Sequence, residues 1–223
     1  MKKPAEKNTR QAILNAAAKI FATNGYASAT TRAIASEAKV NLALINYHFF
    51  SKEELYRATV EMLFEDLAKP MMVLPDRVTD AESWERALRS WVRQALALTG
   101  AEEPPQLWCA RLMAQEHCLP SAMAEDVYQL FAVPVYDSLR RLIRMGMSDP
   151  DDSVTLNLMF NSVVGQGMVY ALHTKWERLL KPAKISRKLW LRYVADYMVD
   201  GLLAKLKFQE SQAVKNINEE KGV

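Results

Sequence analysis

The sequence predicts an all-α protein, with three short helices near the N-terminus and longer helices after them. The chain has 223 residues, of which 50% are hydrophobic, so it can bury a substantial core. It contains only seven glycines and nine prolines, and it has no run of alternating β-branched residues bounded by hairpin turns. Length alone leaves open whether one large domain or two small ones form this core.

The first predicted helix follows a polar arm and begins after a cap at Asn8 or Thr9. It ends at Asn24-Gly25, and its apolar residues form one stripe that faces a core: Ile13, Ala16, Ala17, Ile20 and Phe21. Thr30 caps a second, short helix that turns inward Ile34, Ala35 and Ala38. Residues 39–41 form a tight turn before a third helix that reaches about Phe49. Three short helices in so few residues are typical of small DNA-binding domains.

Caps and prolines mark the later helices. Two capping boxes, Ser51-Lys52-Glu53-Glu54 and Thr79-Asp80-Ala81-Glu82, start helices that end at Lys69-Pro70 and near Gly100. Pro104-Pro105 starts a helix that reaches about Cys118, and Pro134 is expected to kink or split the next one. Asp149-Pro150-Asp151-Asp152 precedes an uncharged helix, and Ser186 caps a last long helix that ends near Phe208. We expect a polar, disordered tail over residues 209–223.

Positive charge is concentrated near the N-terminus. The formal net charge is only +3, but residues 1–52 hold eight Lys or Arg side chains against two acidic ones, and the remainder is slightly acidic. A cationic first quarter suits a protein in which one end approaches phosphates. The alternative is an ordinary solvated basic surface.

The sequence indicates no disulfide, metal site or membrane span. Cys109 and Cys118 lie about 180° apart on one predicted helix, and no Cys or His cluster has metal-ligand spacing. Residues 154–174 lack charged side chains, but polar residues interrupt an apolar pattern of helical spacing, which is typical of a helix buried in protein. No apolar signal segment follows Met1, so we expect a cytoplasmic protein with reduced cysteines.

The third predicted helix presents a small, partly polar surface. At about 100° per residue, Ile45 and Phe49 share one direction and anchor the helix inward. Ala43, Leu44 and Tyr47 then point outward. Such a surface can enter the major groove of DNA, where the small Ala43 keeps the helix close to the bases.

The side chains on and beside this surface match the groups of DNA. Asn46 can offer a paired donor and acceptor to adenine, and Leu42 or Leu44 can contact a thymine methyl group. Tyr47 and His48 are suited to phosphate oxygens. The alternative is that Tyr47 and His48 are interfacial side chains between the third and fourth helices.

Two helix starts add support for DNA binding. Thr31 and Arg32 lie in the first turn of the second helix, where amides and a cation can hold a phosphate and where Arg32 can reach a guanine. Lys52 lies in the first turn of the fourth helix, where it opposes the helix dipole. An outside anion would explain this lysine, and an ordinary solvated lysine is the alternative.

A longer signature runs through the first quarter of the chain: residues 13–21, Gly25-Tyr26, Thr30-Thr31-Arg32, Ile34-Ala35, Ala38, Tyr47-His48-Phe49 and Ser51-Lys52-Glu53-Glu54-Leu55. This signature resembles that of the TetR family of transcriptional regulators. The resemblance implies that phosphates are contacted by Thr31, Tyr47, His48 and Lys52. It implies that bases are faced by Arg32, Leu42, Leu44 and Asn46.

The chain departs from the family pattern at three positions. Lys39 stands where a turn glycine is usual, Asn46 where an aromatic residue is common and Phe50 where a polar residue is common. The operator sequence of a relative therefore cannot be transferred. Farther along, a weaker similarity to the C-terminal domain of CecR-like members covers roughly residues 84–176 and is carried by residues 111–120 with Glu116, Pro134-Val135-Tyr136 and Gly165-Gln166-Gly167.

The last two predicted helices offer wider apolar faces than one neighbour would cover. In the last helix, two adjacent rows are apolar: Leu189, Tyr193, Tyr197 and Gly201, then Trp190, Val194, Met198 and Leu202. The family resemblance implies a homodimer whose four-helix interface uses these helices. We expect the interface to contain Phe160, Val164, Gly167, Leu189, Trp190, Tyr193, Val194, Tyr197 and Met198. The alternative is an ordinary core within one chain.

Aromatic and sulfur-containing side chains in the middle of the chain can line a mostly apolar cavity for a small-molecule effector. Core packing explains most of these side chains equally well. The expected effector contacts are Trp108, Arg111, Met113, Glu116, His117, Tyr128, Phe131, Gln166, Tyr170 and His173. We expect no metal and no cofactor besides this effector.

Together these patterns predict a ligand-responsive repressor, with a helix-turn-helix DNA-binding domain in residues 1–52 and a helical ligand-binding and dimerisation domain in residues 53–208. A homodimer would read a palindromic operator through two helices ~34 Å apart, and a small, largely apolar effector that prefers a splayed dimer would release it. The rival is an α-helical small-molecule-binding protein or enzyme without DNA affinity. No Ser/His/Asp order, paired-carboxylate motif or phosphate-cradling glycine loop provides a catalytic centre for it.

Overall fold

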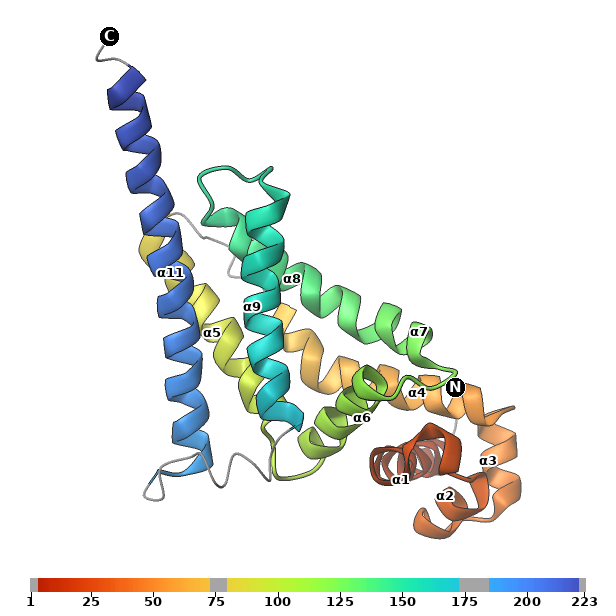
Figure 1. Cartoon of the computed structure of the whole chain (residues 1–223). Helices are drawn as coiled ribbons and strands as arrows, with labels where there is room; N and C mark the ends of the chain where they lie inside the picture. Colours follow the sequence, from red (N-terminus) through yellow and green to blue (C-terminus); the bar gives the residue numbers. More distant parts are fainter. Residues whose placement is uncertain (1–3, 73–79, 173–184, 221–223) are drawn as a thin grey trace. The chain divides into compact units, whose positions relative to one another are not determined.

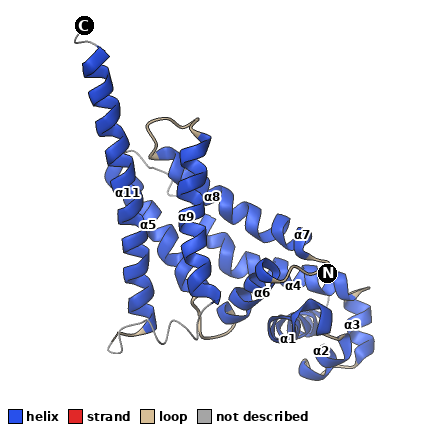
Figure 2. Ribbon diagram, viewed as in Figure 1, coloured by secondary structure: helices blue, strands red, loops and turns tan. Residues whose placement is uncertain are grey.

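The computed structural model describes the backbone of residues 4–72, 80–172 and 185–220, and the side chains of residues 8–72, 80–169 and 185–206. Every regular element in these ranges is a helix, so the all-α prediction is confirmed (Figure 2). The chain forms two compact units (Figure 1): Met1–Met72 with Leu98–Val135, and Val73–Ala97 with Tyr136–Val223. No described helix is long and apolar enough to cross a membrane.

The first unit begins with helix α1 (Pro4–Ser28). This helix starts before the predicted cap at Asn8 or Thr9, because nothing in the polar arm stops a helix once Pro4 provides a first-turn residue. Gly25 adopts a left-handed φ of 75°, which breaks the helical path where the sequence predicts the helix end. The predicted stripe is confirmed at Ile13 and Phe21, which are fully buried.

Helices α2 (Thr31–Glu37) and α3 (Leu42–His48) follow as two short elements. Thr30 caps α2 by accepting a hydrogen bond from Ala33 N, and Asn41 caps α3 by accepting one from Ala43 N. Lys39 lies in the turn between them with φ 55°, a left-handed conformation that explains why glycine suits this position. The three-helix layout predicted for the N-terminus is confirmed.

Helix α4 (Lys52–Leu63) continues through a π-helical turn, η1 (Phe64–Ala68), and a 3₁₀ turn, η2 (Lys69–Met72). The Ser51 hydroxyl accepts a hydrogen bond from Glu54 N, as the capping box predicts. The Glu54 carboxylate reaches back to the N–H of Phe50, one residue before the cap. Helix α1 packs against α2, α4 and α6.

The remainder of the first unit comprises α6 (Gln106–Cys118), α7 (Ala124–Val127), the π-helical turn η3 (Tyr128–Ala132) and the start of α8 (Val133–Met145). The π-helical turn ends two residues before Pro134, so the α-helical hydrogen-bond pattern is interrupted there, but the helical path is continuous from Ala124 to Met145 and the predicted split does not occur. The interruption follows because proline has no N–H and its ring crowds the preceding turn. Cys109 is buried, Cys118 is exposed, and both are free thiols.

The second unit contains α5 (Ala81–Thr99), most of α8, α9 (Ser153–Leu172) and α11 (Arg187–Glu220). Two tryptophans of α5 hold α8: the Trp84 indole donates to the Leu142 carbonyl at 2.6 Å, and the Trp91 indole donates to the Ser138 hydroxyl at 2.8 Å. Gly146 lies against Trp84, where an added Cβ would be 2.0 Å from the ring atom Cζ2. Only glycine fits there without a shift of the buried indole.

Two predicted helix boundaries need correction. The cap of α5 is Asp80, whose carboxylate accepts from Ser83 N at 2.7 Å while Ser83 Oγ accepts from Asp80 N at 3.2 Å. The predicted cap Thr79 lies outside the described residues. Helix α11 begins after its predicted cap Ser186 but ends at Glu220 instead of near Phe208. Residues 209–220 contain neither Gly nor Pro, so no residue type there stops the helix.

Candidate nucleic-acid interface

Helix α3 has a buried inner face and a free outer face. Ile45 and Phe49 are 1% and 2% exposed, which confirms that they anchor the helix. Leu44 and Tyr47 are 39% and 67% exposed, as the sequence predicts. Ala43 is exposed as well. The helix therefore presents a free outer face while its inner face belongs to the core of the first unit.

The flanking residues of α3 are also placed as the sequence predicts. Asn46 is exposed, and Leu42 and His48 are half-buried at the two sides of the outer face. The imidazole of His48 contacts the Tyr47 ring edge to face, with ring centres 5.1 Å apart. Both rings remain accessible, so the contact orients them without covering them.

Helix α2 contributes an exposed cation next to this surface. Thr30 is occupied with capping, which orients the first turn of α2 and leaves Thr31 half-buried and Arg32 exposed. Within the described part of the chain, Arg32 has no ion-pair partner. Arg32 can therefore turn toward an anion or a base edge without breaking an existing contact.

Lys52 is attached to the C-terminal end of α1, which the sequence does not reveal. Its ammonium group donates to the Ala27 carbonyl at 3.2 Å and lies 4.4 Å from the centre of the Tyr26 ring. These partners offset the unfavourable position of a lysine in the first turn of a helix. The ammonium group has three N–H donors, and the Ala27 carbonyl accepts from only one of them, so donors remain for a phosphate.

Tyr26 and Glu53 form a second link between the same elements. The Tyr26 hydroxyl donates to Glu53 Oε1 at 2.6 Å. Burial and the adjacent carboxylate raise the pKa of Tyr26 to about 12, and the hydrogen bond from Tyr26 lowers the pKa of the exposed Glu53 to about 2. The Tyr26 ring also contacts the rings of Phe21 and Tyr56. The start of α4 is therefore held against α1 by an aromatic cluster and two polar contacts.

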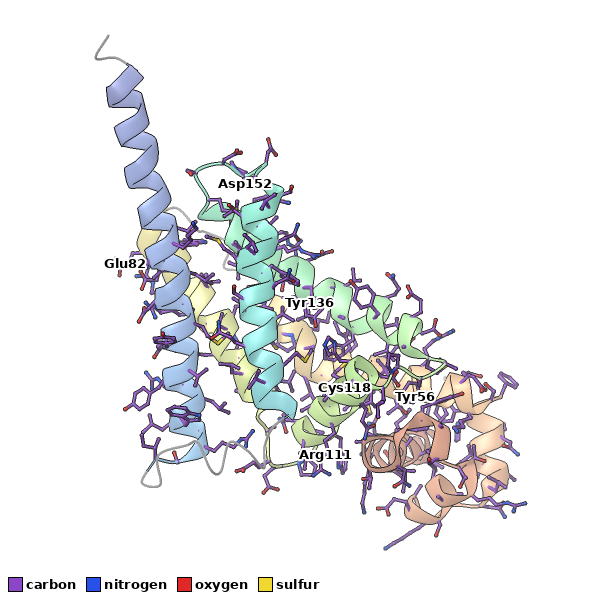
Figure 3. The ribbon with its side chains drawn as sticks, viewed as in Figure 1. Tyr56, Glu82, Arg111, Cys118, Tyr136 and Asp152 are labelled. Atoms are coloured by element: carbon purple, nitrogen blue, oxygen red, sulfur yellow. The ribbon has the colours of Figure 1, made fainter. Side chains whose placement is uncertain are left out.

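A buried polar network joins α4 to α6 within the first unit. Tyr56 lies where α1, α4 and α6 meet (Figure 3), is 1% exposed, and donates its hydroxyl to the carboxylate of Glu116. The same carboxylate accepts from Ser121 N at 3.0 Å and Ser121 Oγ at 2.8 Å. Burial and Glu116 raise the pKa of Tyr56 well above its usual range. Gln115, which precedes Glu116 in α6, donates to the Ala22 carbonyl of α1 at 3.0 Å.

These tyrosines predict a specific loss of stability at alkaline pH. A raised folded-state pKa means that the native protein holds a proton that the unfolded chain releases above about pH 10, so stability falls as pH rises from 10 toward 12. The variants Tyr26→Phe and Tyr56→Phe lack this proton and are expected to show a flatter decline. Urea unfolding at about pH 8 and about pH 11 measures this. Equal declines in these variants and in Tyr128→Phe, an exposed control in the same unit, would contradict the expectation.

The predicted effector contacts divide between the two units. In the first unit, Phe131 is buried against the Phe64 ring at 5.7 Å, and Trp108 and Met113 are half-buried. Glu116 is half-buried and occupied by the network described above. The remaining side chains of the first unit are exposed: Arg111, His117 and Tyr128, with Arg111 labelled in Figure 3. In the second unit Gln166 is exposed, while the side chain of Tyr170 and all of His173 lie outside the described residues.

The structure separates the two apolar rows of α11. Leu189, Tyr193 and Tyr197 are 40%, 51% and 78% exposed, whereas Val194 and Met198 are 8% and 4% exposed. Val194 and Met198 of the second row therefore belong to the core of their own unit. Burial of apolar area drives this face of α11 into the core, and Arg89 and Arg93 of α5 pair with Asp196 outside the buried face.

Helix α9 shows the same division. Phe160 is 6% exposed and contacts the ring of Tyr136, so it is a core residue instead of the predicted interface residue. Val164 and Gly167 are half-buried, and Trp190 of α11 is likewise half-buried. An outward row on α9 was missed by the sequence reasoning and contains Val154, Leu158, Gly165 and Val169. Spacings of four and seven residues in the sequence could have identified it.

Two protein-family models match this chain. A family model described as "Bacterial regulatory proteins, tetR family" matches residues 13–59. A second, described as "HTH-type transcriptional dual regulator CecR, C-terminal domain", matches residues 84–202, which is more than half of the chain. The described residues contain no group of three or more His, Cys, Asp or Glu that could hold a metal ion.

Two curated relatives are similar in sequence. The dual regulator CecR of Shigella flexneri is 25% identical over 157 residues, which cover 65% of this chain and 68% of the relative. The nicotine-responsive repressor HdnoR of Paenarthrobacter nicotinovorans is 35% identical over 79 residues, which cover 35% of this chain and 39% of the relative.

Solved structures show the same fold. A TetR-family regulator from Mesorhizobium loti superposes with a TM-score of 0.61 at 19% identity and covers 91% of this chain and 98% of its own. FadR from Bacillus halodurans superposes with a TM-score of 0.61 at 18% identity and covers 91% and 96%. The matched families contain transcriptional regulators and not enzymes. This chain therefore belongs to the TetR family of bacterial transcriptional regulators.

Proposed function

We propose that the protein is a ligand-responsive transcriptional repressor that binds a palindromic operator as a homodimer and is released by a small, largely apolar effector. Regulators of this family bind operator DNA and small-molecule effectors and act as dimers. The observation that carries the proposal is the outer face of α3, which is held outward by the buried Ile45 and Phe49 and lies in the cationic first quarter of the chain. We place the DNA-binding function in residues 1–52 and the other functions in residues 53–208.

The DNA contacts that we propose follow from exposure and chemistry. Thr31, Tyr47, His48 and Lys52 would contact phosphates, and their hydroxyl, imidazole and ammonium groups are suited to this. Base edges would be met by residues of α3 and by one cation of α2: Arg32, Leu42, Ala43, Leu44 and Asn46. A protein with this surface turned toward duplex DNA would have affinity that falls with salt, because phosphate contacts release counterions.

Homodimerisation is supported by the outward apolar rows of α9 and α11. Tyr193 and Tyr197 of α11 are exposed, and so are Leu158 and Val169 of α9. A Cβ added to Gly165 or to Gly201 would meet no heavy atom within 4 Å, so a partner helix can approach these positions closely. Large exposed aliphatic and aromatic side chains in regular rows are typical of interfaces. We therefore restrict the proposed interface to the outward rows and the half-buried Val164, Gly167 and Trp190.

Release by an effector is supported by the link between α6 and α4. Glu116 of α6 binds Tyr56 of α4, and α4 directly follows the reading helix. A ligand that moves α6 would change the position of α4, and it would weaken DNA binding if it prefers the moved state. The name of the nicotine-responsive repressor supports a small, largely apolar effector and repression, whereas that of the dual regulator CecR adds activation as the second mode.

The experiment that tests DNA binding is selection of duplexes from a pool randomised over about two helical turns, with the purified full chain. We expect enrichment of one palindromic sequence and its release by some members of a panel of apolar compounds. Transcription from a promoter carrying that sequence then distinguishes repression from activation. Recovery of no enriched duplex at low salt would overturn the proposal.

Removal of one cation tests the phosphate contacts. The variant Lys52→Ala is expected to weaken binding to all duplexes and to reduce the slope of log K against log salt by about 0.9, because one phosphate contact is lost. The variant Asn46→Ala should instead relax base preference at one position. Lys188→Ala, which removes an exposed cation from α11, is the matched control. A salt slope in Lys52→Ala equal to that of Lys188→Ala would argue against a contact between Lys52 and phosphate.

A further inference from the structure

The outer face of α3 contains no charged side chain. From Leu42 to His48 the helix reads Leu-Ala-Leu-Ile-Asn-Tyr-His, with Ile45 buried beneath it. Guanine is most often read by arginine or lysine at its O6 and N7 atoms, and cytosine N4 by an acidic side chain. Helix α3 can supply neither of these contacts. Direct reading of G·C pairs by α3 therefore lacks the groups that usually perform it.

The same face matches both halves of an A·T pair. Leu44 is 39% exposed, Leu42 is half-buried at the edge of the face, and Ala43 between them is exposed. Aliphatic groups contact the C5-methyl group of thymine, which is the only apolar group that a base presents in the major groove. Asn46, which is exposed, carries the paired donor and acceptor that adenine N7 and N6 require.

We propose that α3 reads A·T pairs, with Leu42 and Leu44 contacting thymine methyl groups and Asn46 contacting adenine. This inference rests on the proposed DNA-binding function and specifies the bases that it recognises. Guanine is then expected only where Arg32 of α2 or Lys39 of the turn before α3 reaches, because both are exposed cations beside α3 that have no ion-pair partner among the described residues. The operator half-site would contain a run of A·T pairs with a G·C pair at its edge.

Replacement of thymine by deoxyuridine tests the methyl contacts. Uracil lacks the methyl group but keeps every hydrogen-bonding group of thymine, so only the apolar contact changes. In the duplex enriched by the full chain, we expect deoxyuridine at each contacted thymine to weaken binding about fourfold, which corresponds to loss of one buried methyl group. Deoxyuridine at thymines outside the half-sites should leave the affinity unchanged.

The leucines are tested in the same duplexes. In Leu42→Ala or Leu44→Ala, the deoxyuridine penalty at the matching thymine is expected to disappear, because the apolar partner is gone. Leu119→Ala, which truncates a leucine that is 81% exposed on the first unit but outside α3, should keep every penalty. Unchanged far-ultraviolet circular dichroism and thermal unfolding would show that the surface variants are folded.

The outcomes separate this inference from the proposed function. A duplex that is enriched and bound but is insensitive to deoxyuridine, or whose penalties persist in both leucine variants, would overturn the inference while DNA binding stands. A half-site rich in G·C pairs opposite α3 would overturn it as well. If no duplex is enriched and the chain instead captures a protein through this face, the proposed function itself fails.

Discussion

Replacement of Tyr193 and Tyr197 together by glutamate is expected to convert the proposed dimer into monomers and to lower affinity for the proposed palindromic operator at least about 100-fold. The two tyrosines are 51% and 78% exposed on the outward row of α11, so glutamates there do not disturb the core of the subunit. In an apolar interface, however, each carboxylate would lose its hydration without gaining a partner, at a cost of several kcal/mol. A monomer then binds one half-site and loses the gain from two linked reading helices.

Sedimentation velocity measures the oligomeric state, and fluorescence anisotropy with the selected duplex measures the affinity. The control is the pair Tyr193→Phe and Tyr197→Phe, which keeps the apolar area and removes only two hydroxyl groups. We expect this control to remain dimeric. A glutamate variant that stays dimeric at the same concentration would show that these side chains lie outside the interface.

Glu116→Ala is expected to destabilise the protein by about 2 kcal/mol, because it leaves the buried hydroxyl of Tyr56 without an acceptor. It also removes the acceptor for Ser121 N and Oγ in the turn after α6. Both losses loosen the attachment of α6 to α4. An additional weakening of operator binding is expected, since α4 supports the reading helix that precedes it.

Urea unfolding of a double-mutant cycle isolates the contact. Tyr56→Phe removes the buried hydroxyl, so Glu116→Ala in the Tyr56→Phe background should cost less than Glu116→Ala alone. Glu125→Ala, which removes an exposed carboxylate of α7 in the same unit, is the matched control. Additive effects of the two substitutions would mean that the hydrogen bond contributes nothing to stability.

Several helix caps could be predicted from the sequence because their partners are close along the chain. Thr30 binds Ala33 N, Ser51 binds Glu54 N and Ser186 binds Leu189 N, each three residues away. The side of α3 that faces the core could also be predicted, since the spacing of Ile45 and Phe49 places both on one side of any helix. The outward placement of Leu44, Asn46 and Tyr47 follows from that geometry.

The partners of Lys52 and Glu116 could not be predicted in this way. Lys52 binds the Ala27 carbonyl, 25 residues earlier, and Glu116 binds Tyr56, 60 residues earlier. No local pattern encodes such a pairing, because it depends on how α1, α4 and α6 pack. The sequence therefore identified Glu116 as a polar candidate for an effector, while the structure shows it occupied within the first unit.

The amino-acid pattern on its own determined the helical class, most helix starts and the side of α3 that faces outward, since each depends on residues within one or two turns of each other. Only the tertiary structure decided which of two apolar rows on α11 is buried. Periodicity reveals that both rows are apolar, but packing of α11 against the other helices of its unit sets the rotation of the helix, and no local pattern encodes that packing. Burial of Val194 and Met198 and exposure of Tyr193 and Tyr197 result from that rotation.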